Sequence, residues 1–247
     1  MTIQKNLNLV EEKIQRACDR VGRSRDSVTL VAVSKTHSAE VVIEAYQAGL
    51  RHFGENRVEE AEVKIPRVNT VTTDAQDQVI WHMIGHIQSR KAKQIPPLFD
   101  WIHSVDSLKL AKKLDGEVAQ ESQQKLNILL EINVSGEASK SGFAADRLGN
   151  DLEQDREFWT TLGAIHQLSS LQVRGLMTMA PIVDDMEQAR SVFTKLFQLR
   201  EKITQQLGMN WPELSMGMTD DFPVAIEEGA TLIRVGRALF GERSTYI

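Results

Sequence analysis

Short apolar and β-branched runs alternate with longer amphipathic segments along most of the chain. The short runs have the length and residue types of buried strands. In the longer segments, apolar residues recur at intervals of three and four, as on one face of a helix. This alternation is typical of βα units on a parallel sheet. It predicts strands at residues 28–34, 52–54, 80–87, 101–105, 126–134, 173–179, 213–216 and 231–235.

Three amphipathic segments have the clearest helical spacing. Residues 39–49 and 186–207 are predicted helices between strands. Their apolar faces consist of Val42, Ile43, Tyr46 and Leu50 in the first, and of Phe193, Leu196, Phe197 and Leu199 in the second. A further helix is predicted at the start of the chain, with an apolar face of Leu7, Val10, Ile14, Ala17 and Val21. This face must pack onto another part of the protein, and the bottom of a barrel is one candidate.

Eight predicted strand and helix units in 247 residues match the usual size of a (β/α)8 barrel, whereas an open doubly wound sheet normally contains fewer strands. No stretch rich in Gly, Ser and Pro is long enough for a linker. We therefore predict a single (β/α)8 (TIM) barrel with an extra N-terminal helix, in one α/β domain that spans residues 1–247. Two polar stretches, residues 67–78 and 146–157, are expected to be surface loops or insertions.

Composition and charge argue against several classes of protein. The 29 Lys and Arg residues against 34 Asp and Glu residues leave a net charge of −5, which disfavours a nucleic-acid-binding surface. The one dense basic cluster, Arg90, Lys91 and Lys93, is interpreted as a solvated helix face. A hydrophobic share of 41% and a charged share of 26% are those of an ordinary globular chain.

The chain contains no recognisable targeting or membrane-spanning segment. No apolar run approaches the roughly 20 residues that span a bilayer, and the first residues lack the apolar core of a signal peptide. The single cysteine, Cys18, cannot form an internal disulfide, which fits a reducing compartment. We therefore expect a soluble cytoplasmic protein with no membrane or nucleic-acid partner. The lack of an obvious apolar surface stripe favours a monomer.

The residues that follow the predicted strands are the candidate functional residues, because the working side chains of a barrel lie at the C-terminal ends of its strands. The first strand leads into Lys35, which alone would be interpreted as a solvated loop lysine, and the second leads into Asn56. In the third, His82, His86 and Gln88 share one face by the period of two. The histidines could ligate a metal, but no cysteine or obvious carboxylate accompanies them. We therefore predict no metal site and favour interior histidines with polar partners, or contacts to a ligand.

Small, hydroxyl-bearing and glycine residues follow the last three predicted strands. They are Thr178, Ser215, Gly217, Thr219 and Gly236. Barrels commonly bind phosphate there, between the loops after the last two strands and a helix N-terminus. Alternatively, the run around Gly217 is a tight turn with core methionines, and Thr219 caps a helix. Together with Lys35 and Arg234, however, these residues indicate a site for a phosphorylated aldehyde cofactor, with Lys35 as the imine and Arg234 at a ring nitrogen.

Four runs of this chain resemble the pyridoxal phosphate homeostasis proteins, also called the YggS- or PROSC-like family. The most specific run combines rare residue types at fixed spacing: Trp81-His82-Met83-Ile84-Gly85-His86-Ile87-Gln88-Ser89-Arg90-Lys91. The others are Phe53-Gly54-Glu55-Asn56, Ser215-Met216-Gly217-Met218 and Arg234-Val235-Gly236. The resemblance extends over nearly the whole chain.

The resemblance implies a barrel of the alanine racemase N-terminal type that binds pyridoxal 5′-phosphate (PLP) as an internal aldimine on Lys35. It implies Asn56 beside the ring and Arg234 at the pyridine nitrogen, with Thr178 and His82 as further contacts. For the phosphate it implies Ser215, the backbone around Met216 and Gly217, Thr219, Gly236 and Arg237. The family usually has Ser at the position of Thr219, and the threonine keeps the hydroxyl group that a phosphate cradle needs.

The same resemblance implies a protein that binds PLP without efficient catalysis. An arginine at the pyridine nitrogen makes the cofactor a weaker electron sink than a carboxylate would. The main alternative, an amino-acid racemase, needs a second base, which similar racemases take from a tyrosine of an additional β-domain. The two tyrosines of this chain are Tyr46, on a predicted outer helix, and Tyr246, near the end. Neither is placed to act as that base, so we assign no catalytic residues.

The expected role is in the homeostasis of PLP (vitamin B6) inside the cell and in the balance of amino and keto acids. The protein would buffer PLP, deliver it to PLP-dependent apo-enzymes, or report PLP status to a regulatory protein. The sequence leaves these alternatives open.

Overall fold

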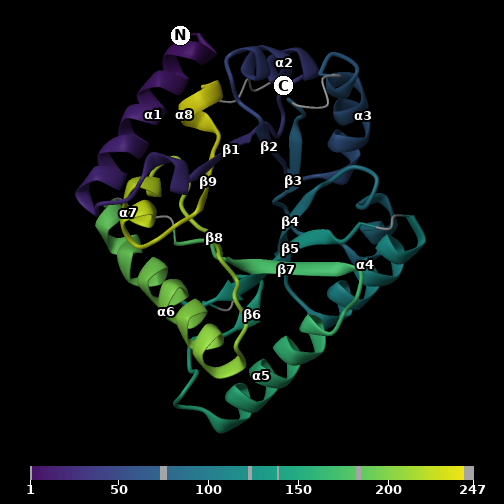
Figure 1. Ribbon diagram of the computed structural model, residues 1–247, viewed down its shortest axis with the longest axis vertical. Helices are drawn as coiled ribbons and strands as arrows, with labels where there is room; N and C mark the ends of the chain where they lie inside the picture. Colours follow the sequence, from purple (N-terminus) through teal and green to yellow (C-terminus); the bar gives the residue numbers. More distant parts are fainter. Residues whose placement is uncertain (1, 73–76, 122–123, 138, 182–184, 242–247) are drawn as a thin grey trace.

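Parallel strands form a closed barrel that is surrounded by helices (Figure 1). The computed structural model describes residues 2–72, 77–121, 124–137, 139–181 and 185–241. In these residues the barrel strands are β1 (Thr29–Val33), β2 (His52–Glu55), β3 (Ile80–Met83), β4 (Trp101–Val105), β5 (Leu126–Asn133), β7 (Leu171–Met177), β8 (Glu213–Ser215) and β9 (Leu232–Val235). They run in the order β4-β3-β2-β1-β9-β8-β7-β5, and the pairing of β4 with β5 closes the ring. The predicted (β/α)8 barrel is confirmed.

Every predicted strand corresponds to one barrel strand, and the bounds of β4 are those predicted. The third strand was expected to extend to residue 87, but β3 ends at Met83. Just beyond it, Gly85 packs so closely on Asn56 that a Cβ atom on the glycine would lie 2.2 Å from the Asn56 carbonyl oxygen. The chain leaves the sheet at this contact. The prediction that His86 and Gln88 continue the inward face of β3 is therefore wrong, and both are exposed.

Helices form the outer layer of the molecule (Figure 1). Their bounds are α1 (Ile3–Arg20), α2 (Ala39–Gln47), α3 (Val58–Asn69), α4 (Leu108–Glu121), α5 (Leu152–His166), α6 (Arg190–Leu207), α7 (Phe222–Glu227) and α8 (Arg237–Phe240). Short 3-10 turns are η1 (Arg25–Ser27), η2 (Ser89–Gln94) and η3 (Met186–Ala189). The predicted helices 39–49 and 186–207 thus correspond to α2 and to η3 followed by α6.

Three local features differ from the predictions. The stretch 146–157 is not a continuous loop, because α5 begins within it and the Asp151 carboxylate accepts the N–H groups of Glu153 and Gln154. Similarly, α3 extends into the stretch 67–78, of which residues 73–76 lie outside the described residues. A two-residue strand, β6 (Phe143–Ala144), pairs with the end of β5. It was not predicted, because two residues are too few for a periodic pattern.

The N-terminal helix α1 is present as predicted, with Leu7, Val10 and Ile14 buried on its apolar face. It packs against α7 and α8 at the edge of the helical layer (Figure 1). Across this contact, Asn6 Nδ2 donates to the Leu239 carbonyl at 2.8 Å. The helix thus extends the outer layer instead of covering the bottom of the barrel, the placement considered above. Val21 lies just beyond its last turn and is exposed.

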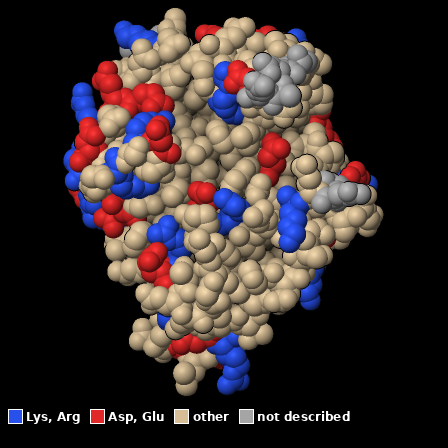
Figure 2. Space-filling view, viewed as in Figure 1, with Lys and Arg blue, Asp and Glu red and all other residues tan. Residues whose placement is uncertain are grey.

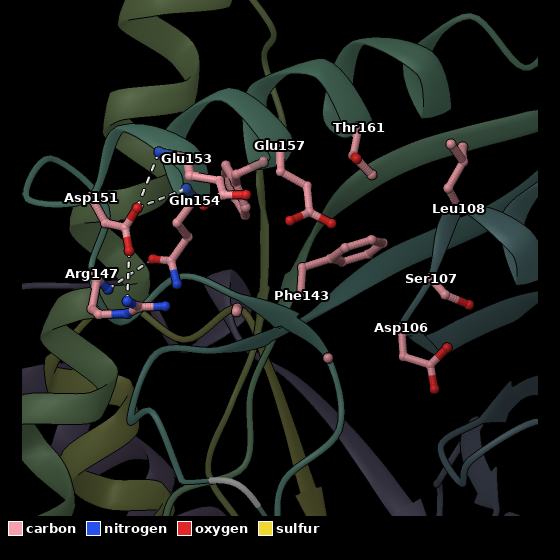
Figure 3. A pocket seen from close by; sticks show the side chains of 13 residues that line it. Asp106, Ser107, Leu108, Phe143, Arg147, Asp151, Glu153, Gln154, Glu157 and Thr161 are labelled. Atoms are coloured by element: carbon pink, nitrogen blue, oxygen red, sulfur yellow. Dashed lines mark hydrogen bonds and ion pairs between the residues drawn. The ribbon is translucent and has the colours of Figure 1, made fainter.

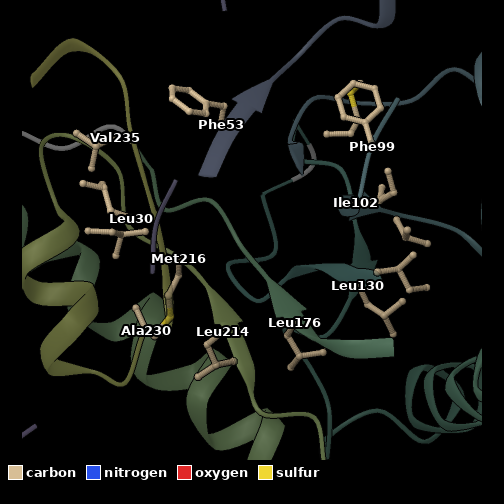
Figure 4. Packing of buried hydrophobic residues seen from close by; sticks show 14 of the residues in the cluster. Leu30, Phe53, Phe99, Ile102, Leu130, Leu176, Leu214, Met216, Ala230 and Val235 are labelled. Carbon is tan, nitrogen blue, oxygen red and sulfur yellow. The ribbon is translucent and has the colours of Figure 1, made fainter. Parts of the chain in front are cut away.

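The main hydrophobic core lies between the barrel and the helices (Figure 4). Alternate residues of each strand contribute to it, as Leu30 and Ala32 do from β1. Residues between them face the inside of the barrel, where Val31, Leu129, Met177 and Leu232 form a second, smaller apolar cluster. Cys18 is fully buried in the main core.

Much of the barrel interior is polar. In a parallel sheet, paired residues on neighbouring strands point to the same face. Val31 is paired with His52 on one side and with Arg234 on the other, so these two side chains also face inward. His82 also faces inward, because it is paired with Trp101, which packs against the inner apolar cluster. Ser215 faces inward because it is paired with Met177 of that cluster. Apolar burial on the outside of the barrel therefore leaves the inside available for polar chemistry.

Three further observations concern helix length and the charged surface. No helix within the described ranges is long and apolar enough to cross a bilayer. Acidic and basic side chains are interspersed over the face seen in Figure 2. In the basic cluster of η2, Lys91 forms an ion pair with Glu59 at 2.8 Å, while Arg90 and Lys93 are exposed.

Candidate functional site

Lys35 lies at the C-terminal end of β1, as predicted. It occupies a turn between β1 and α2 and is half-buried. The next residue, Thr36, has a φ of +69°, a left-handed conformation that a β-branched residue rarely adopts. Its backbone N–H donates to Glu60 Oε2 at 2.9 Å, which ties the turn to the first turn of α3. The lysine is thus presented from a constrained turn at the mouth of the barrel.

Ser34, Glu55 and Lys64 form a buried group behind this turn, which we call the ion-pair cluster. Glu55 Oε1 accepts hydrogen bonds from Ser34 Oγ at 2.6 Å and from Lys64 Nζ at 2.7 Å. Lys64 Nζ also donates to the carbonyl of Ser34 at 2.9 Å. Burial raises the pKa of Glu55, against the opposing effect of the Lys64 ammonium. Ser34 immediately precedes Lys35, and Glu55 immediately precedes Asn56. Both Lys35 and Asn56 are predicted cofactor contacts.

Lys64 was not among the predicted site residues, although the chain carried a signal for it. In α3 the buried positions are Val58, Ala61, Lys64, Ile65 and Val68, so a lysine lies on an apolar helix face. A buried lysine is almost always paired, and the acidic partner here comes from the end of a neighbouring strand.

Asn56 carries an unsatisfied polar atom. Its Oδ1 is buried and has no hydrogen-bond partner among the described residues. Its backbone is fixed from the other side by Gly85, which approaches too closely for any side chain at that position. Because buried side-chain oxygens nearly always have a donor, this oxygen is available to accept a hydrogen bond from a bound group or a water. A cavity of about 580 Å³ that opens at the ends of β2 and β3 includes Asn56 in its lining.

Arg234 on β9 is buried, with 5% of its surface exposed. Its Nη1 donates to Ser215 Oγ at 2.5 Å, and its Nη2 donates to the Thr178 carbonyl at 3.0 Å. Burial lowers the pKa of Arg234 to about 10, while Asp221 and Glu131 act in the opposite direction. The guanidinium therefore stays charged at neutral pH and is held on two sides.

A line of hydrogen-bonded side chains leads from Ser215 through three interior histidines. We call this group, which consists of Ser215, His103, His82 and His52, the histidine relay. His103 Nδ1 lies 2.8 Å from Ser215 Oγ, and His103 Nε2 lies 2.9 Å from His82 Nδ1. His82 Nε2 in turn lies 2.9 Å from His52 Nδ1. Burial is the main cause that lowers the pKa of His82 and His103 well below the usual value. These rings are therefore neutral near pH 7.

The relay bears on two predicted cofactor contacts. His82 is fully buried and its two ring nitrogens are bonded to other histidines, which favours the interior role over a contact with the cofactor. The Ser215 hydroxyl is engaged by Arg234 and His103, which favours a role beside Arg234 over one in a phosphate cradle.

His103 and His52 were not among the predicted site residues, although His103 has an inward period-two position after Trp101 on β4. Thr178 is also occupied, because its Oγ1 donates to the Ile132 carbonyl at 2.8 Å.

The loop after β8 wraps around the start of α7. Gly217 has a φ of +91°, and a Cβ atom there would lie 2.6 Å from Ala225 Cβ and 2.9 Å from Phe222 Cα. Only glycine fits both the conformation and the space. The Thr219 hydroxyl accepts from the N–H of Gly236 at 3.4 Å, so the loops after β8 and β9 touch.

The side chains of two residues of the predicted phosphate site are engaged elsewhere, whereas the resemblance implies a role for the backbone at these positions. The Met216 side chain is fully buried in the hydrophobic core (Figure 4), and its N–H donates to the Leu232 carbonyl. This matches the alternative of core methionines in the turn. Arg237 is exposed and forms an ion pair with Asp220.

A separate cavity of about 520 Å³ lies beside β6 and α5 (Figure 3). None of the predicted site residues lines it. Some of its polar groups are paired: Arg147 Nη1 lies 2.6 Å from Asp151, and Asp106 lies 3.0 Å from His86 Nδ1. In the described ranges no group of three or more His, Cys, Asp or Glu side chains is arranged to hold a metal ion.

Comparisons with known proteins agree with the predicted fold and family. The model of the family "Alanine racemase, N-terminal domain" matches residues 6–244. A pyridoxal phosphate homeostasis protein of Haemophilus influenzae is 38% identical, with 99% of this chain and 97% of that protein covered. A protein of the same name from Pseudomonas aeruginosa is 40% identical, with 98% and 96% covered.

Solved structures extend this comparison. PipY of Synechococcus elongatus, described with PLP bound, is 37% identical with a TM-score of 0.73, over 93% of this chain and 100% of that one. A protein of Bifidobacterium adolescentis, described as unknown, gives a TM-score of 0.86 at 33% identity, over 96% and 94% of the two chains. An alanine racemase of Clostridium difficile is 14% identical with a TM-score of 0.68, which shows a shared fold alone. The match covers 99% of this chain but only 58% of the racemase chain.

Proposed function

This chain belongs to the family of pyridoxal phosphate homeostasis proteins, and from that premise we propose that it binds PLP at the C-terminal end of its barrel and takes part in PLP homeostasis. The relatives of that name match it over almost the full length of both chains. PipY, whose structure is described with PLP bound, matches it in the same way.

The observation that carries the proposal is the placement of Lys35 and Arg234 on neighbouring strands. β1 and β9 pair in parallel with Val31 opposite Arg234, and Lys35 follows at the end of β1. An amine that can bond to an aldehyde thus lies at the barrel mouth just beyond β1, and a fixed guanidinium that can meet a ring nitrogen faces the barrel interior from the neighbouring strand. The unsatisfied Oδ1 of Asn56 at the end of the next strand supports a bound group there.

Each group would have a distinct role in binding. Bound PLP supplies an electrophilic aldehyde that condenses with amines. Lys35 would hold the cofactor through a Schiff-base linkage, formed by its Nζ with loss of water. Arg234 would donate to the pyridine nitrogen, since a guanidinium offers donors only. Gly217, Thr219 and Gly236, in the two touching loops, would meet the phosphate.

We further propose that the protein holds PLP without efficient turnover. An arginine that stays charged near pH 7 does not stabilise a protonated pyridine ring, so the bound cofactor would be a weak electron sink. Tyr46, a possible base by residue type, lies on the outer helix α2, where its hydroxyl donates to the Asp77 carbonyl at 3.0 Å. Tyr246 lies outside the described residues.

The proposed site draws on both ends of the chain, because β1 and β9 are neighbours. This supports the proposal that residues 1–247 work as one domain. A monomeric state, a cytoplasmic location and the choice among buffering, delivery and sensing stay predictions. Faster transfer of PLP to an apo-enzyme from the loaded protein than into a chemical trap would favour delivery. A partner that binds only the loaded or only the empty protein would favour sensing.

An absorbance spectrum tests the central claim. Wild-type protein saturated with PLP is expected to show the visible band of a lysine Schiff base, and Lys35→Ala to lack it. Lys93→Ala, a change of an exposed lysine, is the matched control and should keep the band. A wild-type spectrum without the band, or a Lys35→Ala spectrum with it, would overturn the proposal. Interconversion of L- and D-alanine at ordinary enzyme rates would overturn the non-catalytic role.

A further inference from the structure

The hydrogen-bond donors of the histidine relay can be ordered from Arg234 outward. A guanidinium only donates, so Ser215 Oγ must accept from Arg234 Nη1. The hydroxyl has one proton to give, and its other recorded partner among the described residues is His103 Nδ1. The oxygen can also accept a second bond, but only donation to His103 Nδ1 gives the hydroxyl proton a recorded acceptor. We therefore assign His103 Nδ1 as the acceptor, which places the ring proton on Nε2.

The same logic carries along the two remaining links. His103 Nε2–H donates to His82 Nδ1, so the proton of His82 lies on its own Nε2. His82 Nε2–H donates to His52 Nδ1 at the start of β2. All bonds of the chain therefore run in one direction, away from the guanidinium. Each acceptor atom faces the cation, and hydrogen bonds in such a series polarise one another.

Arg234 needs this support because it is a buried cation without a contacting carboxylate. In the described part of the chain no ion pair is recorded for its guanidinium, and the acidic groups that influence it, Asp221 and Glu131, act at longer range. An isolated buried charge is costly unless dipoles or partners compensate. Three neutral imidazoles and a hydroxyl, aligned with their negative ends toward the cation, provide fixed dipoles of the required sign.

We propose that the histidine relay is a positioning device for Arg234. It holds the guanidinium in place through Ser215, stabilises its charge by aligned neutral dipoles, and leaves its remaining N–H groups for the ligand. The statement about Arg234 rests on the structure alone. The consequence for the pyridine nitrogen of PLP rests on the proposed function.

The direction of the relay can be measured without the cofactor. Full-length protein free of PLP and labelled with ¹⁵N in histidine would be studied near pH 7 by long-range ¹H–¹⁵N correlation, with single-histidine substitutions for assignment. His82 and His103 are expected to be neutral, each with a protonated Nε2 and an unprotonated Nδ1. A protonated Nδ1 on His103, or a doubly protonated ring at either position, would overturn the proposal.

The positioning role is tested with Ser215→Ala, which removes the link between Arg234 and the histidines. Ser215→Thr keeps the hydroxyl and is the matched control. Binding of PLP would be compared with binding of an analogue that has carbon in place of the ring nitrogen. In Ser215→Ala, affinity for PLP is expected to fall about tenfold while affinity for the analogue stays unchanged, because only the ring-nitrogen contact is lost. Ser215→Thr is expected to restore most of the difference.

The outcomes separate the two proposals. Equal losses for PLP and the analogue in Ser215→Ala would place Ser215 at the phosphate or in the fold, and would overturn the positioning role. A wild-type protein that binds neither compound would overturn the proposed function. In that case the histidine tautomers would still decide whether the relay has the inferred direction.

Discussion

The ion-pair cluster and the histidine relay are two buried polar groups that support the two ends of one proposed site by different physics. Behind Lys35, Glu55 and Lys64 meet at 2.7 Å, and each charge is compensated by the other. Behind Arg234, the relay contains no charge when its rings are neutral, and the cation is compensated by dipoles.

The difference explains why each device suits its position. An ion pair uses the charge of both partners for each other, so it makes a rigid base for the turn that carries Lys35 without adding net charge. Neutral dipoles stabilise a cation but leave its charge available to a ligand. The ion-pair cluster thus supports the turn that carries the Lys35 amine. The histidine relay supports Arg234 and leaves its positive charge available to a ligand.

The largest expected effect comes from breaking the ion-pair cluster. Lys64→Met should destabilise the protein by about 3–5 kcal/mol, because it leaves the Glu55 carboxylate buried without its partner. The measurement is the free energy of unfolding in urea. Lys93→Met, at an exposed position, should change that free energy by less than about 0.5 kcal/mol.

A double substitution sharpens the interpretation. Adding Glu55→Gln to Lys64→Met removes the uncompensated charge and should recover part of the lost stability. A Lys64→Met protein within about 1 kcal/mol of wild type would mean that Glu55 takes up a proton at little cost, and that the cluster is not held by charge.

A smaller effect is expected in the loop beside the relay. Gly217→Ala should destabilise by about 1–3 kcal/mol, because its Cβ would collide with Ala225 and Phe222 at a left-handed φ. It should also weaken PLP binding if the loop holds the phosphate. For stability alone, Gly236→Ala is the matched control, since its Cβ would meet Val33 at an ordinary 3.5 Å without a left-handed φ. Equal stability losses in the two variants would contradict the role of loop shape.

The smallest effect distinguishes the two groups by pH. The folded-state pKa values of His82 and His103 lie below the ordinary 6.5, so the unfolded chain binds more protons as the pH falls. Stability should therefore be lost on acidification from about pH 7, by somewhat less than about 1 kcal/mol per histidine down to pH 6. The loss continues until the folded-state pKa values are reached.

Glu55 should behave in the opposite way. Its folded-state pKa is raised above the ordinary 4.5, so the folded protein binds the proton first and acidification through that window adds stability. Urea unfolding from pH 8 to pH 5 tests both signs, with Glu55→Gln as the variant that lacks the second contribution. A stability that rises steadily from pH 7 to pH 6 in Glu55→Gln would contradict neutral interior histidines.

Local patterns were sufficient to predict the strands and several of their terminal residues. Lys35 and Arg234 could be found because each lies at or just after an apolar run whose period and length indicate a strand. Glu55 was visible in the sequence, but its partner Lys64 is reached only through the packing of α3 on β1 and β2. The early end of β3 depended on the contact between Gly85 and Asn56, which no local period contains.

The sequence by itself determined the class of fold, the eight strand positions and the polar residues at their ends, because these follow from periodicity and residue type over short distances. Only the tertiary structure decided which polar residues meet. Barrel closure between β4 and β5, and the register that sets Val31 between His52 and Arg234, bring together side chains from five strands. Partners in the barrel interior are separated by up to 112 residues along the chain, as His103 and Ser215 are, so their hydrogen bonds depend on strand register and not on local sequence.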